Sequence, residues 1–184
     1  MNSKIAPILV VACGNVMAGD DAFGAQVLRA LERHPMSGVE LLDLSTDPSV
    51  LLNHLGSRSA LIVVDAARVD DLPTGTLIEC DWDSPQRTRL AVGQSCGSTH
   101  GLGLADHIEM ARRLGMLPPV VKLIALSITE AEVGQAQSRK LLRQIRAAAR
   151  RVRNLAASLA ASKPGAGQGA TTPQNSNARG RSAG

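Results

Sequence analysis

Two short apolar runs constrain the fold of this 184-residue chain more than any other feature of its sequence. Residues 8–12 and 60–64 are continuously apolar, rich in β-branched side chains, and too short to be buried helices. Such runs are typical of strands that are covered on both faces, as in parallel sheets. We therefore expect a sheet that lies between two layers of helices.

The segments between these runs carry the spacing of amphipathic helices. Apolar residues recur at intervals of three and four over residues 21–34 and 134–161, and two further helices are expected to begin after Asp47 and after His100. Additional strands are expected at residues 39–44, 76–80 and 120–128. Alternating strands and helices predict an α/β fold with three layers: a doubly wound, mostly parallel sheet with helices on both faces.

Charge and composition divide the chain into a domain and a tail. Residues 1–132 hold ten Lys or Arg against sixteen Asp or Glu, a balance of 10 − 16 = −6. The remaining basic residues follow Glu132, and many form one stripe of the helix at 134–161, where we expect a solvated face rather than a docking surface. Residues 163–184 lack hydrophobic periodicity, which predicts a disordered tail after a single domain at 1–162.

Several classes of partner and location are disfavoured. With one Phe, one Trp and no Tyr, the chain lacks the stacking platforms that bind single-stranded nucleic acid. No run reaches the ~18 apolar residues of a membrane span, and the first residues make a poor export signal. Cys13, Cys80 and Cys96 form no CxxC pair and are odd in number, which is typical of thiols in a reducing compartment. We expect a cytoplasmic protein with neither nucleic acid nor membrane as a partner.

Acidic side chains gather where the expected strands end. The loop after the first strand carries Asp20 and Asp21, and Asp65 directly follows the run at 60–64, so that we expect Asp65 to end this strand. Ligands of doubly wound sheets bind beyond the carboxyl ends of the strands. Asp21 is therefore a candidate functional residue, whereas Asp20 is expected to have a structural role at the start of a helix.

A nucleotide-binding module is a weaker alternative for the same loop. Its glycine spacing is that of neither a dinucleotide loop nor a P-loop, and carboxylates repel phosphate. An imidazole beside the acids would instead complete a metal site, for which His100 and His107 compete on spacing alone. Two carboxylates and one imidazole suit zinc, nickel or iron, and such an ion can polarise a peptide carbonyl or activate water.

A second constellation has the residues of a serine hydrolase. Residues 93–97 match the G-x-S-x-G pattern around Ser95, and Asp106 and His107 follow. The match lies in a polar loop rather than at a strand-to-helix elbow, and adjacent residues of a helix point in different directions. Serine chemistry, or Cys96 as a nucleophile, is therefore the weaker hypothesis.

Three segments together resemble the hydrogenase maturation protease family over about residues 5–160. They are the first loop with Gly14-Asn15, Asp20-Asp21 and Gly24, the strand end at residues 61–66, and residues 98–106 around His100. The resemblance implies an endopeptidase that removes a C-terminal extension from the large-subunit precursor of a nickel–iron hydrogenase after nickel insertion. It also implies that three residues bind metal. They are the second acid of the loop, the acid at the strand end and the histidine, which correspond to Asp21, Asp65 and His100.

The same resemblance implies how these residues act. The family is thought to sense nickel that is carried by the substrate, and it is classed with aspartic-type peptidases, so Asp21, Asp65 and His100 are expected to be both metal-binding and catalytic. A maturation factor that binds the metal-loaded precursor without cutting it is the alternative. We expect a monomer.

Two segments depart from the family pattern. Ala12 stands where the first loop usually has a glycine, and Cys13 precedes Gly14. The residues after the second expected strand, Asp43-Leu44-Ser45-Thr46, lack the glycines that are usual in the family. Whether Asp43 contacts a substrate is therefore left open by the sequence.

Overall fold

The computed structural model describes residues 6–92, 102–129 and 133–162. Six strands form one sheet with the order β2-β1-β3-β6-β4, and β5 pairs with β3 outside this path. The strands are β1 (Ile8–Ala12), β2 (Val39–Asp43), β3 (Ala60–Arg68), β4 (Leu77–Asp81), β5 (Ala91–Val92) and β6 (Val120–Ile128). The helices are α1 (Phe23–Glu32), α2 (Leu51–His54), α3 (Leu104–Arg113) and α4 (Arg139–Ala161), with short 3-10 turns η1 (Gly19–Ala22), η2 (Pro48–Val50) and η3 (Arg87–Arg89).

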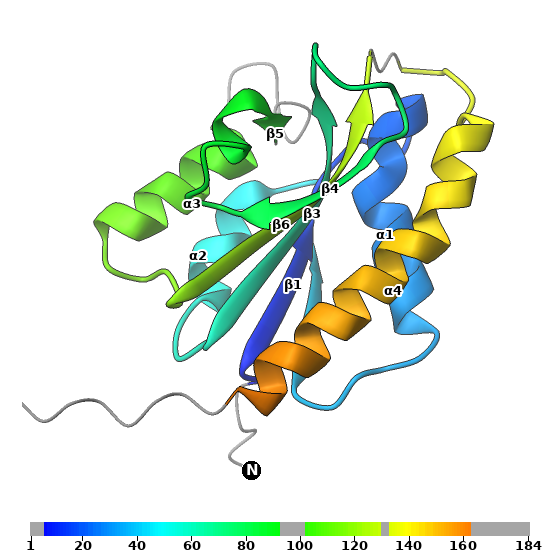
Figure 1. The fold of residues 1–184 in the computed structure, drawn as a ribbon. Coiled ribbons are helices and arrows are strands. Elements are labelled where there is room, and N and C mark those ends of the chain that lie inside the picture. Colours follow the sequence, from blue (N-terminus) through cyan, green and yellow to red (C-terminus); the bar gives the residue numbers. More distant parts are fainter. Residues whose placement is uncertain (1–5, 93–101, 130–132, 163–184) are drawn as a thin grey trace, which may run out of the picture.

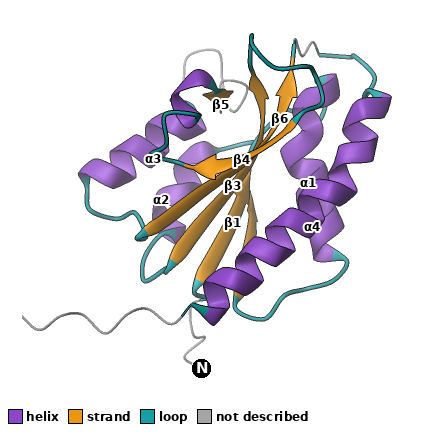
Figure 2. Ribbon diagram, viewed as in Figure 1, coloured by secondary structure: helices purple, strands orange, loops and turns teal. Residues whose placement is uncertain are grey.

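The sheet is mostly parallel and lies between two helical layers, which confirms the predicted fold class. β2, β1, β3 and β6 are parallel neighbours, whereas β4 runs antiparallel to β6 and β5 antiparallel to β3. Helices α1 and α4 cover one face of the sheet, and α2 and α3 cover the other (Figures 1 and 2).

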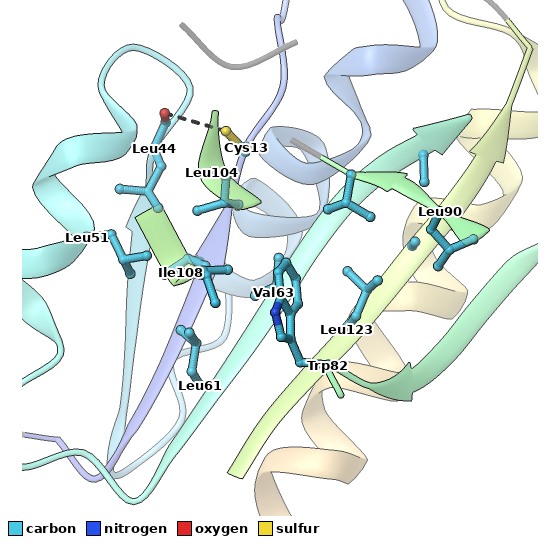
Figure 3. Close-up of a cluster of buried hydrophobic side chains, with 14 of the residues drawn as sticks. Cys13, Leu44, Leu51, Leu61, Val63, Trp82, Leu90, Leu104, Ile108 and Leu123 are labelled. Carbon is cyan, nitrogen blue, oxygen red and sulfur yellow. Dashed lines mark hydrogen bonds between the residues drawn. The ribbon is translucent and has the colours of Figure 1, made fainter. Parts of the chain in front are cut away.

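Two apolar clusters hold the layers together. Along β3, Leu61 and Val63 belong to the cluster under α2 and α3, while Ile62 and Val64 belong to the cluster under α1 and α4. This alternation is the two-residue period of a strand that is buried on both faces. Figure 3 shows the first cluster, which includes both Val63 and Trp82.

Two boundaries differ from the prediction in ways that bear on the site. The strand at 120–128 is confirmed, but β3 continues through Asp65 to Arg68, so the expectation that Asp65 ends this strand is wrong. The longer strand forms because β6 pairs with every residue of β3. Helix α4 begins at Arg139 rather than near residue 134, because the Ser138 side chain caps it by accepting from the Leu141 N–H.

The long loop expected over residues 81–99 contains η3 and β5 in its described part. The predicted tail at 163–184 lies outside the described residues, and the division into domain and tail stays a prediction. Among the described helices, none combines the length and the apolarity needed to cross a bilayer. The cytoplasmic location and the monomeric state stay predictions.

Candidate functional site

The site is centred on a short gap along one side of β3. β1 pairs with β3 as far as Val64, which lies opposite Ala12, and β5 pairs with β3 from Ala67 onward. Because β6 occupies the other side of β3 along its whole length, β1 and β5 must follow one another on the same side. Asp65 lies directly after the end of β1, in the gap between the two partner strands.

The strand fixes the direction of the Asp65 carboxylate. Val63 and Ala67, two residues before and after it, pack in the cluster under α2 and α3, so the Asp65 side chain points to this face. The backbone N–H of Ala66 donates a hydrogen bond of 2.9 Å to Asp65 Oδ1. Asp65 is 2% exposed, so its carboxylate is held in a largely desolvated position.

The first loop brings Asp21 to the same edge of the sheet. Gly14 has a φ of +131°, and a Cβ there would lie 2.1 Å from the Asp21 carbonyl oxygen, so only glycine allows this close approach. The N–H of Asn15 donates a 2.5 Å hydrogen bond to Asp21 Oδ2, and Asp21 is 1% exposed. The loop therefore folds back and places a second buried carboxylate just beyond β1.

Gly24 brings the start of α1 against the end of β1 and the middle of β3. A Cβ at this position would lie 2.5 Å from the Cys13 carbonyl oxygen and 2.7 Å from that of Val64. The glycine thus lets the helix that follows Asp21 pack directly on the end of β1 and on the middle of β3, next to Asp65. This contact explains the spacing of Gly14, Asp21 and Gly24 in the sequence, and it places Asp21 and Asp65 at one edge.

The neighbouring acids have structural partners. Asp20 Oδ1 accepts a 2.7 Å hydrogen bond from the Ser138 N–H, which ties η1 to the start of α4. The role expected for Asp20 at the start of the first helix stays a prediction. Asp43 is exposed, and its Oδ1 accepts from the N–H and the hydroxyl of Ser45, at 2.9 and 2.5 Å. Asp43 therefore stabilises the turn after β2.

The structure tests only one of the two competing histidines. His100 lies outside the described residues, as do Ser95 and Cys96. His107 is buried in α3, with Nδ1 2.9 Å from the Gly103 carbonyl oxygen.

The surroundings of His107 include Asp47, which precedes η2. Hydrogen bonds from Ser49 hold the pKa of Asp47 below its usual value, and His107 adds a smaller electrostatic contribution. His107 therefore lies near η2. Asp106 accepts from the Gly103 N–H at 2.9 Å and caps α3, so the described residues contain no Asp106–His107 pair of the kind that a serine triad requires.

One functional candidate, Arg87, was missed by the sequence reasoning. Its guanidinium carbon lies 4.1 Å from the centroid of the Trp82 ring. Burial lowers the pKa of Arg87 below its usual value, and the nearby Cys80 and Asp65 charges partly oppose this shift. The one signal in the sequence was the only Trp of the chain at the start of a long polar segment.

The cysteines differ from the expectation of three thiols. Cys80 is a free, buried thiol, and burial raises its pKa. Cys13 is disulfide-bonded, so its interpretation as a thiol is wrong. The Cys13 sulfur lies 3.7 Å from the Leu44 carbonyl oxygen, and both residues belong to the first apolar cluster (Figure 3).

The chemistry of this edge is that of an incomplete cation site. No three His, Cys, Asp or Glu side chains within the described residues are arranged to hold a metal ion. Two carboxylates alone are fewer protein ligands than zinc sites usually have. A metal at Asp21 and Asp65 would therefore need a further ligand, from residues outside the described part or from a substrate.

Comparisons with known proteins all identify proteins of hydrogenase maturation. The sequence profile of the hydrogenase maturation protease family matches residues 25–156. The chain is 32% identical to the hydrogenase expression/formation protein HupD of Thiocapsa roseopersicina over 67% of its own length and 55% of that protein. It is 33% identical to the hydrogenase 2 maturation protease of Escherichia coli, over 65% of the chain and 71% of the relative. A hydrogenase maturating endopeptidase from Escherichia coli has a similar structure, with a TM-score of 0.68, 28% identity, and coverage of 84% of this chain and 93% of that one.

Proposed function

This chain belongs to the hydrogenase maturation protease family, and we propose that it is an endopeptidase that removes the C-terminal extension of a nickel–iron hydrogenase large-subunit precursor after nickel insertion. The observation that carries the proposal is the pair of buried carboxylates, Asp21 and Asp65, at one edge of the sheet. Both lie near the carboxyl ends of parallel strands, where ligands of doubly wound sheets bind.

In this proposal Asp21, Asp65 and His100 bind the nickel ion that the precursor carries. Oxygen and nitrogen ligands suit a divalent ion of this kind. One oxygen of Asp21 and one of Asp65 is fixed by a backbone N–H, so each carboxylate has a defined orientation toward the incoming metal. The ion is part of the substrate, and its arrival reports that the precursor is ready to be cut.

The same carboxylates supply the proton transfers that peptide hydrolysis requires. A carboxylate accepts a proton from water as the water oxygen adds to the carbonyl carbon, and it returns the proton to the leaving nitrogen as the C–N bond breaks. Burial limits competing water near the reacting bond. Asp65, on a strand, and Asp21, on a loop, would thus both bind metal and take part in catalysis.

The test is to incubate the purified protein with the precursor in nickel-loaded and nickel-free forms. Mass spectrometry should detect a shortened large subunit only with the loaded form. Asp43→Asn is a matched control, since this acid lies at the same end of the sheet but serves a turn, and it should cleave normally. An intact precursor, under conditions in which a known member of the family cuts it, would reject the proposal. Binding without cleavage would favour a non-catalytic maturation factor.

A further inference from the structure

The segment between β4 and β5 holds Arg87 over the face of β3 that carries Asp65. Trp82, at one end of this segment, belongs with Val63 to the cluster under α2 and α3 (Figure 3). At the other end, β5 pairs with Ala67 and Arg68. Val63 and Ala67 flank Asp65 on its own face of the strand, and Arg87 lies close enough to Asp65 for the two charges to interact.

The guanidinium of Arg87 is oriented by Trp82, and its Nε lacks a hydrogen-bond acceptor among the described residues. It lies 4.1 Å from the centroid of the Trp82 ring, and such stacking restricts the plane of the group. Its Nε is buried and has no hydrogen-bond acceptor within the described part of the chain. Buried donors without a partner are rare in folded proteins, and each calls for an explanation.

Other partly buried arginines of the described chain are fully engaged. Arg58 donates to two carbonyl oxygens and to Glu40, and Arg153 donates to the carbonyl oxygens of Leu31 and His34 at the end of α1. Arg87 is close enough to be influenced by the charge of Asp65, but it forms no ion pair with a described residue. An arginine held in this way is prepared to donate to an acceptor that arrives later.

We propose that Arg87 is a substrate-binding residue, and that its guanidinium donates hydrogen bonds to a main-chain carbonyl oxygen of the precursor next to Asp65. This inference rests on the proposed function. An endopeptidase acts within a chain, so a carbonyl oxygen must lie close to its acids whatever the side chains of the substrate are. A guanidinium stays protonated and presents several donors in a fixed plane, which suits such an oxygen.

The test compares two changes in η3. Arg87→Met removes the donors but keeps an unbranched apolar side chain that can cover Trp82. Arg87→Lys keeps the charge and loses the planar fork. Arg89→Met is the matched control, because Arg89 lies in the same turn with a side chain that is 75% exposed and only a 3.9 Å ion pair to Asp71. Initial cleavage rates of the nickel-loaded precursor are measured with the full chain, together with thermal unfolding.

Arg87→Met should lower kcat/KM about 10- to 100-fold, the range expected for one charge-assisted hydrogen bond. Its unfolding midpoint should equal or exceed that of the unmodified protein, since an unsatisfied buried donor is removed. The kcat/KM of Arg87→Lys should fall between those of the unmodified protein and Arg87→Met. Arg89→Met should stay within about twofold, as expected for an exposed ion pair. A purely structural role would instead lower the unfolding midpoint and leave the rate per folded molecule unchanged.

The two proposals fail in different ways. If the unmodified protein cleaves the precursor and Arg87→Met cleaves equally well, the Arg87 proposal is wrong and the proposed function stands. If the unmodified protein does not cleave, the proposed function is wrong, and Arg87 is then tested by the affinity for the nickel-loaded precursor. Equal affinity of the unmodified protein and Arg87→Met, or no binding by either, would overturn the Arg87 proposal as well.

Discussion

The two ends of the sheet carry polar clusters of opposite character. At the amino end, the Glu40 carboxylate binds two basic side chains. One oxygen lies 2.8 Å from His54 Nδ1, and the other accepts a 2.7 Å hydrogen bond from Arg58. At the carboxyl end, Asp21 and Asp65 each accept from a backbone N–H, and the Arg87 Nε has no acceptor among the described residues. Charged side chains thus bind one another at the amino end, whereas at the other end one arginine donor has no acceptor among the described residues.

The strongest test of this contrast is to remove charge at the carboxyl end. Asp65→Asn and Asp21→Asn keep the shape and the hydrogen-bond acceptor of each side chain but remove its charge and its ability to act as a base. Precursor cleavage should fall about 10²- to 10⁴-fold, the usual contribution of a general acid or base.

The free energy of unfolding of these variants, measured in urea, should change by less than about 1 kcal/mol, because the acceptors remain. A large loss of stability with normal cleavage per folded molecule would show that the carboxylates serve the fold, and the contrast between the two ends would disappear.

The converse change is Arg58→Met at the amino end. Arg58 has a side chain that is 4% exposed, and it donates to the Ala6 and His54 carbonyl oxygens at 2.5 and 2.8 Å and to Glu40. Its loss should cost about 3 kcal/mol, as for breaking a buried ion pair that leaves its acceptors behind.

Urea unfolding measures this loss, and cleavage per folded molecule should be unchanged. Arg150→Met, on the exposed face of α4, is the control and should change stability by about 0.5 kcal/mol or less. Reduced cleavage by fully folded Arg58→Met would mean that the two ends are coupled.

The smallest expected effect is on the pH dependence of stability. Burial raises the pKa of Glu40, but hydrogen bonds and charges from Arg58 and His54 outweigh it and hold the pKa below the usual value of 4.5. A lowered pKa in the folded state gives stability that is present above pH 4.5 and is lost as the pH falls through the folded-state value.

Glu40→Gln should therefore be less stable than the unmodified protein near neutral pH, by about 0.2–1 kcal/mol, since the carboxylate is one-third exposed. The difference should shrink below pH 4.5. Urea unfolding at several pH values provides the measurement, and a difference that stays constant down to pH 3 would contradict the assignment.

Much of the fold was predictable because its signals are local. Single segments contain the apolar runs of β1 and β3 and the helical spacing of α1 and α4. For the site, the rule that ligands bind beyond parallel strands predicted that Asp21 and Asp65 lie at the same edge. The extension of β3 was not predictable, since Asp65 and Arg68 interrupt its apolar pattern and only pairing with β6 keeps these residues in the strand.

Arg87 had no comparable signal. An arginine in a polar segment looks like any solvated residue, and its placement depends on Trp82 and β5, which lie on either side of it in the chain. The choice between His100 and His107 came from family resemblance. The structure adds only that His107 lies near η2, because the position of His100 is outside the described residues.

The succession of β1 and β5 along one side of β3 determines which changes in length the protein can tolerate. A residue added between β3 and β5 lengthens a connection and leaves Asp65 in register with Ala125 of β6. A residue added within β3 before Asp65 would turn this carboxylate to the opposite face of the sheet, under α1 and α4. Insertions near the site should therefore accumulate after Arg68 in functional variants, whereas the strand before Asp65 should keep its length.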